Sequence, residues 1–469
     1  MTRVDEAGRA RTRRRSFAIL GLGAALLTGA HAEAQSGADY KKGRIGSTLG
    51  SPQQVADDRL AARLYATPAV QRAIDKLEAA YKQDPAASLP DAEKTLRRAA
   101  EATAMGQAAA VVNQDPDRPA AYWAVTAPHS WGKLDVPLSG AMIDNPDNIY
   151  RTIPIDGAAR YEIRGKVVSP GPSQETFVLH TERSGASKQQ KVRNQEEESG
   201  SVSLDKLPLQ PDGSFVITLD ASPANGRPNH IQTQPEAHDG YVLVRDTLAD
   251  WSRNNPVKLE VRRVSGPPVH SAKTETQLAE QAAELTSTTG PYWLAWARMV
   301  MLSRPVNTFT HQVARATGWG FIKCGHYRLT DAEALVIQLD RRQADYLGFQ
   351  LSDVWGQGQA PEYIERTGSL NGSQAVPNAD GAYTYVISVA DPGVHNWLDP
   401  SGLHAGSFCA RWQKLPAGVS AADAVLAMQV VKLEDLKRLL PADTKFVTPQ
   451  QRTVQLNERM ASYARRLVN

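Results

Sequence analysis

Hydrophobic residues recur with two different periods along this chain of 469 residues. Over residues 55–112 they recur mostly at three- and four-residue steps, as in Leu60, Leu64 and Ile74, which predicts amphipathic helices. From Tyr150 onward the period becomes two, in short runs bounded by Gly, Pro, Asn and Asp. This alternation predicts antiparallel β-strands that bury one face.

The order of these patterns predicts a mainly β fold class with helical segments. We expect two tandem antiparallel β-sandwiches of jelly-roll-like type, with helical N-terminal, bridging and C-terminal segments. Helical patterns at 275–285 and 291–300 form the bridge, and capping-box patterns at 420–423 and 448–451 predict two closing helices. The predicted organisation is an export signal (1–34), a flexible segment (35–54), a helical region (55–143), a first sandwich (144–266), a helical bridge (267–320), a second sandwich (321–418) and C-terminal helices (419–469).

The two β regions resemble each other in sequence. The landmarks Asp212-Gly213, Asn229-His230, Gly240 and Arg245 correspond in order to Asp380-Gly381, Asn396-Trp397, Gly406 and Arg411. The spacings agree to within about one residue, and the step from Gly to Arg is the same in both regions. This agreement predicts two copies of one sandwich, with a chance match as the alternative.

The N-terminus has the three parts of an export signal. The basic run 13–15 precedes an apolar run at 18–27, and Ala32-Glu33-Ala34 matches a cleavage site. The paired arginines resemble a twin-arginine signal, so we expect a periplasmic or secreted protein. A basic N-terminus of no special purpose is the alternative. No other segment is apolar enough to predict a membrane span in the mature chain.

Charge and cysteine content restrict the classes of partner. Removing 1–34 removes six basic and three acidic residues from totals of 53 and 50, which leaves the mature chain neutral. A neutral chain argues against nucleic-acid binding, because that binding depends on clustered Lys and Arg. Cys324 and Cys409 either form one disulfide in an oxidising compartment or are small apolar strand residues.

Several motifs together resemble a known family. They are Asp144-Asn145-Pro146-Asp147-Asn148-Ile149-Tyr150, Pro154-Ile155-Asp156-Gly157, Tyr161-Glu162-Ile163-Arg164-Gly165, the run 331–337, Phe349-Gln350-Leu351, Asp391-Pro392-Gly393 and Asn396-Trp397-Leu398-Asp399. Over residues 96–415 the chain resembles the family catalogued as domain of unknown function 1214. The resemblance implies a jelly-roll-like sandwich in the second half and no settled activity.

The segment 391–412 is unusually rich in residue types that carry chemistry. In its strand-like end Ser407, Cys409 and Arg411 share one face. If that face is buried, the guanidinium of Arg411 needs a carboxylate or a bound anion, because an unpaired buried charge is costly. The structural interpretation is an ion pair between Arg411 and Asp399 that fastens the loop to the strand.

The functional interpretation makes the same segment a ligand site. Arg411 then lies at the mouth of a pocket lined by Asn396 and Trp397 and binds a carboxylate, sulfate or sugar hydroxyl. Arg245 and His230, the corresponding landmarks of the first β region, are further ligand-binding candidates.

Three residues of this segment are candidates for proton transfer. His395 and His404 are the expected acid–base pair, because imidazole titrates near neutral pH, and Asp399 is the candidate carboxylate. Loop histidines that are exposed or hydrogen-bonded are the alternative. The chain has no metal-binding spacing of Cys and His, so no metal site is predicted, and it identifies no cofactor. It also lacks the serine-hydrolase elbow, the phosphate-binding loop and the dinucleotide-binding pattern.

Two hypotheses about function follow. The first is an exported enzyme that acts on a small polar or carbohydrate-like molecule in a pocket of the second sandwich. The second is a non-catalytic binding or assembly module of the cell envelope, with a homo-oligomer as one form. Trp293 and Trp296 share one helical face, either as core residues or as a ligand platform.

Overall fold

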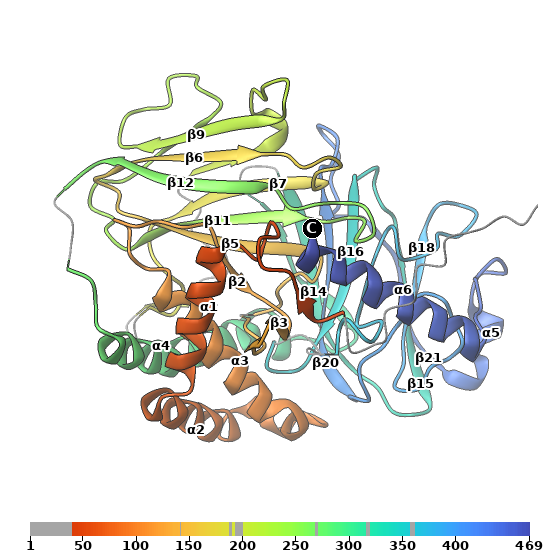
Figure 1. Cartoon of the computed structure of the whole chain (residues 1–469). Coiled ribbons are helices and arrows are strands. Elements are labelled where there is room, and N and C mark those ends of the chain that lie inside the picture. Colours follow the sequence, from red (N-terminus) through yellow and green to blue (C-terminus); the bar gives the residue numbers. More distant parts are fainter. Residues whose placement is uncertain are drawn as a thin grey trace, which may run out of the picture. The chain divides into compact units, whose positions relative to one another are not determined.

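Two β-sandwiches and two groups of helices are the main parts of the computed structural model, in which residues 40–140, 142–186, 190–192, 200–267, 271–315, 319–356 and 362–469 are described (Figure 1). The strands of the described residues form two five-stranded sheets, two four-stranded sheets and one three-stranded sheet. The predicted fold class is confirmed. The predicted export signal lies outside the described residues.

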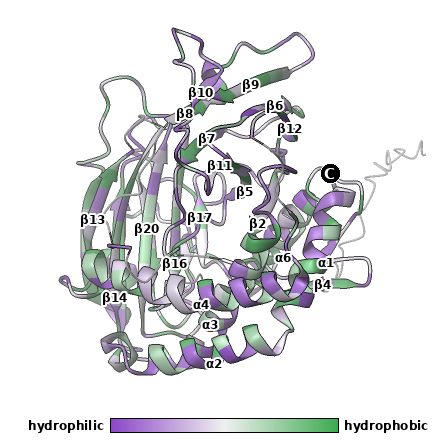
Figure 2. Ribbon diagram, turned by 90° about the vertical axis from the view of Figure 1, so that its left-hand side faces the viewer, coloured by the Kyte–Doolittle hydropathy of each residue, from purple (hydrophilic) through white to green (hydrophobic). Residues whose placement is uncertain are grey.

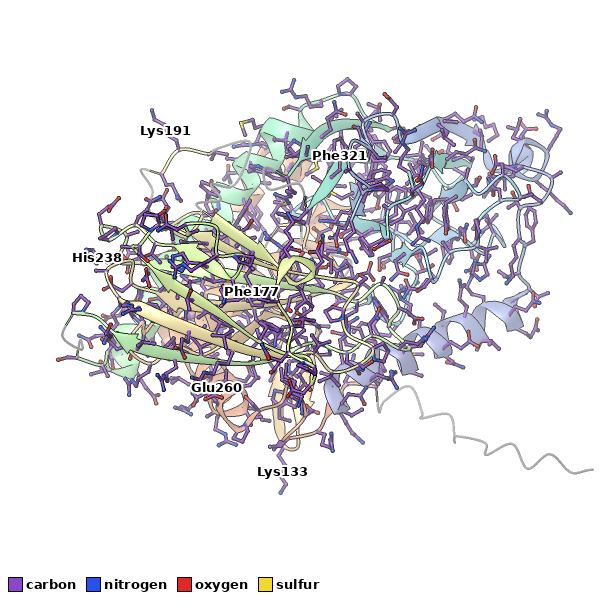
Figure 3. All side chains as sticks on the ribbon, turned by 90° about the horizontal axis from the view of Figure 1, so that it is seen from above. Lys133, Phe177, Lys191, His238, Glu260 and Phe321 are labelled. Carbon is purple, nitrogen blue, oxygen red and sulfur yellow. A yellow bond between two sulfur atoms is a disulfide. The ribbon has the colours of Figure 1, made fainter. Side chains whose placement is uncertain are left out.

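The first sandwich consists of a five-stranded sheet in the order β2-β5-β11-β7-β8 and a four-stranded sheet in the order β10-β9-β6-β12. Its strands are β2 (Tyr122–Val125), β5 (Asn148–Ile155), β6 (Arg160–Lys166), β7 (Gln174–His180), β8 (Gly200–Ser203), β9 (Ser214–Asp220), β10 (His230–Gln232), β11 (Gly240–Thr247) and β12 (Lys258–Ser265). The inner faces bury Phe177, Ile217 and Val244. Figure 3 shows Phe177 among these strands and Glu260 at the periphery.

The second sandwich has a five-stranded sheet in the order β13-β14-β20-β16-β17 and a four-stranded sheet in the order β19-β18-β15-β21. Its strands are β13 (Thr308–Ala314), β14 (Gly320–Arg328), β15 (Glu333–Leu339), β16 (Tyr346–Ser352), β17 (Ser369–Asn371), β18 (Tyr383–Ile387), β19 (Trp397–Leu398), β20 (Ala405–Gln413) and β21 (Val425–Lys432). Phe349, Tyr385, Phe408 and Trp412 fill the space between the sheets.

The two sandwiches have the same strand order. When strands are matched in chain order, β2 with β13 and β5–β12 with β14–β21, every strand has corresponding neighbours in both copies. Each copy also contains a short parallel pair, β9 with β10 and β18 with β19, where antiparallel pairing was predicted. The structural repeat therefore matches the sequence repeat and is not a chance agreement of landmarks.

Corresponding side chains make corresponding hydrogen bonds. The side-chain amide of Asn229 donates to the carbonyl of Val216 at 2.9 Å, and that of Asn396 donates to the carbonyl of Thr384 at 3.0 Å. Both bonds connect the segment before a short parallel strand to the strand beside it. The asparagine at this landmark is therefore explained by the local fold of each copy.

A buried cation occupies the same position in each sandwich. The guanidinium of Arg151, on β5, donates to the carbonyl of Val257 at 2.7 Å. The ammonium of Lys323, on β14, donates to the carbonyl of Ala422. Both carbonyls lie just before the last strand of their sandwich, so each cation connects the five-stranded sheet to the start of that strand.

A layer of helices accompanies the sandwiches. These helices are α1 (Pro52–Tyr65), α2 (Pro68–Lys82), α3 (Ala92–Val112) and α4 (Glu275–Ala297). The predicted break in α4 is absent, and the helix continues through Pro291. At Gly290 the helix lies so close to α2 that an added Cβ would be 2.6 Å from the Leu77 side chain. Packing on α2 therefore outweighs the hydrogen bond lost at the proline.

Two segments before the first sandwich differ from their prediction. The described residues of the region 113–143 contain β2, β3 (His129–Trp131) and β4 (Leu134–Val136) and no helix. The described part of the predicted flexible segment contains β1 (Lys42–Gly43) and the start of α1. Tyr40 and Leu49 are buried in one cluster with Trp131. These two apolar side chains anchor a segment whose polar composition indicated flexibility.

The second sandwich extends beyond its predicted bounds of 321–418 at both ends. Strand β13 lies in the predicted helical bridge, and β21 lies in the predicted C-terminal helices. Ser420 caps a turn, because its hydroxyl accepts a hydrogen bond from the amide of Ala422 at 3.0 Å. The short α5 (Leu436–Leu439) follows, and α6 (Pro449–Val468) begins at the predicted capping box of Thr448 and Gln451.

Hydropathy along the helices is mixed. Figure 2 shows hydrophilic and hydrophobic residues on both α2 and α4, as expected for helices with one buried face. In the described part of the chain, no helix combines the length and the apolar character that crossing a membrane requires.

Candidate functional site

The repeat places Arg245 and Arg411 at equivalent positions. Arg245, on β11, is opposite Tyr150 and Thr176, and Arg411, on β20, is opposite Ile322 and Gly348. Because side chains alternate along a strand, each arginine points away from its sandwich core, to which Val244 and Ala410 belong. Each arginine therefore lies on the outer face of its five-stranded sheet.

Both outer faces line one pocket of about 240 Å³. This volume is slightly below the roughly 300–1,000 Å³ typical of sites for drug-sized ligands. The sequence predicted a pocket in the second sandwich. The pocket observed is instead lined by both sandwiches and by α3 and α4. It is lined by Gln107, Ala110, Val125, Met142, Ile143, Asp144, Asn148, Tyr150, Thr152, Arg183, Ser184, Tyr241, Leu243, Arg245, Thr289, Trp293, Trp296, His311, Val313, Arg315, Trp319, Phe321, Ile322, Arg411 and Gln413.

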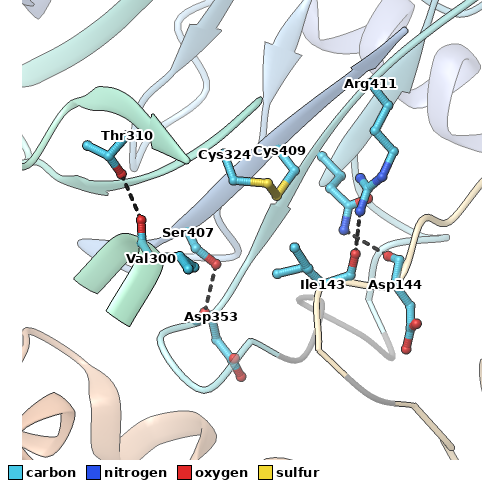
Figure 4. Close-up of a disulfide and its surroundings, with 10 residues drawn as sticks. Ile143, Asp144, Val300, Thr310, Cys324, Asp353, Ser407, Cys409 and Arg411 are labelled. Carbon is cyan, nitrogen blue, oxygen red and sulfur yellow. Dashed lines mark hydrogen bonds between the residues drawn. A yellow bond between two sulfur atoms is a disulfide. The ribbon is translucent and has the colours of Figure 1, made fainter. Parts of the chain in front are cut away.

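Neutral acceptors bind the guanidinium of Arg411. It donates to the carbonyl of Ile143 at 2.6 Å (Figure 4). It also donates to the side-chain oxygen of Gln350. The predicted ion pair with Asp399 is wrong, because Asp399 accepts from Arg366 at 3.0 Å. No ion pair of Arg411 is found among the described residues, so its positive charge is not neutralised by a direct carboxylate partner.

A disulfide lies beside Arg411 on the same face of the sheet. Cys324 and Cys409 are directly opposite each other on β14 and β20 and are bonded (Figure 4). This resolves the alternative left open by the sequence in favour of a disulfide. The bond crosslinks the two strands next to the pocket and lies in an apolar cluster with Ile322 and Trp296.

Arginines and aromatic rings alternate along the pocket wall. The guanidinium groups of Arg245 and Arg315 lie 5.1 Å and 5.0 Å from the centre of the Trp319 ring. Arg183 lies 4.9 Å from the centre of the Tyr241 ring. Each contact is a cation–π interaction, which orients the guanidinium relative to the ring.

The pocket is strongly cationic. Arg183, Arg245, Arg315 and Arg411 all line it, whereas Asp144 is the one carboxylate among its described lining residues. Burial lowers the pKa of Arg183, which indicates a desolvated positive charge. An anionic group that enters this pocket would lower the electrostatic cost of bringing these charges together.

Helix α4 and strand β13 form an apolar wall. Trp293 and Trp296 line the pocket, and the ring centres of Trp296 and His311 are 5.3 Å apart. Burial, followed by the nearby Arg315, lowers the pKa of His311 to about 4. The imidazole is therefore neutral at pH 7 and a weak base. The wall favours binding of an apolar or ring-shaped body over proton transfer.

Metal ligands do not gather in the described part of the chain. No cluster of three or more His, Cys, Asp or Glu side chains is arranged to bind a metal ion among those residues. The lining of the pocket is instead dominated by guanidinium groups and aromatic rings, which are not metal ligands.

Comparison with protein-family models and with curated proteins finds no match. Among solved structures, the chain is similar to an uncharacterized protein from Burkholderia cenocepacia at 22% identity. The similarity covers 81% of this chain and 99% of that one, with a TM-score of 0.61. The VPA0106 protein from Vibrio parahaemolyticus is 10% identical over 80% of this chain and 100% of that one, with a TM-score of 0.38. The first similarity shows a shared fold and nothing further.

Arg245 and Arg411 are the predicted site residues that line the pocket; the other six lie elsewhere. His230 is buried in its own sandwich, where its ring nitrogens lie 2.8 Å from the Thr218 hydroxyl and 2.8 Å from the Ser222 carbonyl. His404 contacts two carboxylates, Asp91 at 2.6 Å and Asp331 at 3.1 Å. These hydrogen bonds give His230 and His404 a structural role.

Asp399 pairs with Arg366, and the remaining three predicted residues, His395, Asn396 and Trp397, lie where helix α6 packs on the second sandwich. Arg452, on α6, donates to the carboxylate of Asp391 at 2.9 Å and to the carbonyl of His395. Its guanidinium lies 5.2 Å from the centre of the Trp397 ring. Asn396 bonds to neighbouring backbone, and burial lowers the pKa of His395. These residues share no cavity with the pocket arginines.

Most of the pocket residues were not predicted from the sequence. Arg183, Arg315 and Trp319 lie in loops or at strand ends, where a single sequence gives no signal for a shared cavity. The available signal was the repeat itself. It marked Arg245 and Arg411 as equivalent, and two equivalent arginines on facing sheets indicate a common site.

Proposed function

We propose that this chain is an exported protein that binds a small anionic molecule with an apolar or ring-shaped body in the pocket between the two sandwiches. Carboxylates, sulfate esters and acidic sugars are the ligand classes. This proposal narrows the expected polar or carbohydrate-like ligand to an anionic one. The observation that supports it is the lining of four arginines and one carboxylate among the described residues.

In this proposal Arg411 makes the directed hydrogen bonds to the anionic group of the ligand. Gln350 and the Ile143 carbonyl orient its guanidinium, and Gln350 is itself oriented by its hydrogen bond to the Asp144 carbonyl at 2.8 Å. A guanidinium oriented in this way binds an oxyanion with little loss of side-chain entropy. The aromatic wall of α4 then accommodates the body of the ligand.

Binding is proposed in preference to catalysis. His395, Asp399 and His404 lie outside the pocket lining, and burial keeps the imidazole of His311 neutral. The proposed export and the proposed membership of the domain of unknown function 1214 family are compatible with a binding protein. The disulfide supports export, because disulfides persist mainly in oxidising compartments.

The test is a thermal-shift screen of the purified chain with small carboxylates, sulfate esters and acidic sugars, each beside its neutral amide, alcohol or sugar. We expect acids to raise the melting temperature and their neutral counterparts to leave it unchanged. Affinity should fall as salt is added, because ions screen the charges. If neutral sugars stabilise the chain as strongly as acidic ones, the proposal is wrong.

Variants locate the site. Arg411→Gln and Arg245→Gln should each weaken binding of the best acid by about 10- to 100-fold, the effect of losing one charged hydrogen bond. Arg262→Gln removes an exposed arginine on β12 and is the matched control, which should bind normally. Equal losses in all three variants would indicate a general charge effect and exclude the pocket.

A further inference from the structure

A second, smaller cavity lies where α6 meets the first sandwich. It has a volume of about 40 Å³. We call it the α6 chamber. Its lining residues are Trp123, Val125, Thr126, Leu138, Ser139, Gly140, Asp144, Asn145, Pro146, Asn148, Tyr363, Tyr463 and Arg466. A water molecule needs about 10–15 Å³ of such space, so the chamber admits a small ion or a few waters and excludes a large organic molecule.

Arg466 brings a buried positive charge to this chamber. The residue is 4% exposed, and its guanidinium lies 4.1 Å from the centre of the Tyr463 ring and 4.7 Å from that of Trp251. One of its nitrogens donates to the carbonyl of Pro146 at 3.1 Å. Within the described part of the chain, no carboxylate forms an ion pair with Arg466.

Three donor nitrogens at the chamber lack a hydrogen-bond partner in the described part of the chain. The Nε and Nη2 atoms of Arg466 and the indole nitrogen of Trp123 are buried and find no hydrogen-bond partner among the described residues. Trp123 is 2% exposed. Both groups are donors only, so neither satisfies the other. Leaving a buried donor unsatisfied costs about 1–3 kcal/mol, and more for a charged group.

We propose that the α6 chamber binds a small monovalent anion, with chloride as the simplest case. An anion accepts hydrogen bonds without donating any, which matches a set of donor-only groups. It also neutralises the buried guanidinium, which a water molecule does not do. Asp144, which lines both the chamber and the larger pocket, is an acceptor and would repel an anion, so we place the anion beside the donors of Arg466 and Trp123.

This site is independent of the proposed function. Neither Arg466 nor Trp123 lines the larger pocket, and the ligand differs in size. The anion joins the last turn of α6 to β2 of the first sandwich, because Arg466 and Trp123 come from these two elements. Its expected effect is therefore on the stability of the folded chain.

The test compares melting temperatures of the full chain in chloride, bromide and formate with those in gluconate, at equal ionic strength. Gluconate is too large for the chamber and controls for salt. We expect the small anions to raise the melting temperature by about 1–2 °C relative to gluconate. Crystals grown in bromide should show an anomalous peak beside Arg466. If formate raises the melting temperature and chloride and bromide do not, the natural occupant is a small carboxylate.

Variants separate anion binding from helix docking. Arg466→Met should abolish the anion-dependent increase. Trp123→Phe, which keeps an aromatic ring but lacks the indole N–H, should weaken anion binding about tenfold. Arg459→Met is the control. Arg459 is equally buried on α6 and bonds to the Tyr363 carbonyl and Ser369, but it does not line the chamber. This variant should melt lower than the wild type yet keep the anion-dependent increase.

Two results would overturn the proposal. One is equal stability of the wild type in chloride, formate and gluconate together with no bromide peak, which means that water fills the chamber. The other is an anion-dependent increase that survives in Arg466→Met, which places the anion elsewhere on the chain.

Discussion

The side chains of Thr247 and Gln413 are joined by a hydrogen bond of 2.7 Å. Each residue lies two positions after the pocket arginine of its own sandwich, so the two copies touch through equivalent positions. Both residues are buried, and the Thr247 hydroxyl also lies 2.9 Å from the Asn148 side chain. This contact keeps the two outer faces together at one end of the pocket.

Breaking this contact should destabilise the chain. Thr247→Val is expected to lower the free energy of unfolding by about 1–2 kcal/mol, because the buried amide of Gln413 loses its partner. Urea denaturation measures the loss. A double-mutant cycle with Gln413→Leu should show a coupling of at least about 0.5 kcal/mol. Additive losses would mean that the two sandwiches do not depend on this bond.

Removing the disulfide should lower the free energy of unfolding more than Thr247→Val does. The paired Cys324→Ala and Cys409→Ala variant is expected to lose about 4 kcal/mol of unfolding free energy, because the bond closes a loop with a sequence separation of 85. A reductant should lower the melting temperature of the wild type and leave that of the variant unchanged. A wild type that is insensitive to reductant would contradict the pairing.

Removing the charge of Glu175 and removing that of Asp246 should have different effects on the stability of the chain. They are opposite each other beside Arg151, which bonds to Asp246 at 2.6 Å. Burial, and then the charge of Asp246, raises the pKa of Glu175 well above its usual value. The folded state therefore retains a proton that the unfolded state releases, so this group contributes less stability as pH rises above about 4.5.

The matched substitutions test this assignment. Glu175→Gln imitates the protonated group, so we expect it to be at least as stable as the wild type at pH 7. Asp246→Asn removes the carboxylate nearest to Arg151 and leaves only the longer contact of 3.5 Å with Glu175, so it should cost about 3 kcal/mol. Chemical denaturation at pH 5 and pH 7 compares them. A large loss in Glu175→Gln would show that Glu175 is ionised in the folded protein.

His404 should make stability depend on pH. Its hydrogen bond with Asp91 raises the pKa of the imidazole. Burial alone would raise the pKa of Asp91, but hydrogen bonds from Lys94 and His404 lower it to about 2. The imidazolium contributes fully below about pH 6.5 and less as pH rises through its raised pKa. Asp91 contributes above about pH 3.8 and less as pH falls toward 2.

His404→Asn isolates this contribution. The amide retains a donor toward Asp91 but carries no charge. We expect the wild type to be more stable than the variant between about pH 4 and pH 6.5, and the difference to shrink at higher pH. Melting temperatures across this range measure it. A difference that is constant with pH would assign the effect to packing.

Local patterns predicted much of the fold. The period of two in the β regions marked most strands, because an alternating sequence has one stable arrangement on a sheet with one buried face. The capping box at Thr448 marked the start of α6. The same reasoning failed at Ser420, because its cap closes a turn and the following residues pair with β15. A local cap does not reveal whether a sheet edge lies nearby.

The candidate site was predicted less well. Arg411 of the segment 391–412 lines the pocket, but the other residues predicted from this segment do not. Asp391 and Trp397 interact with Arg452, which lies far along the chain on α6. A segment that must accept a buried arginine contains the same aromatic and acidic residues as a ligand site. Residue content alone therefore does not distinguish the two.

The sequence by itself determined the class of the fold, the repeat and the equivalence of Arg245 with Arg411, because all three follow from patterns within or between short segments. Only the tertiary structure decided that the two arginines face one pocket and that Arg411 bonds to neutral acceptors. It also decided that the polar segment before β20, which contains Asp391 and Trp397, packs against α6. Such contacts join residues that are far apart in the chain, and they depend on how whole sheets and helices pack.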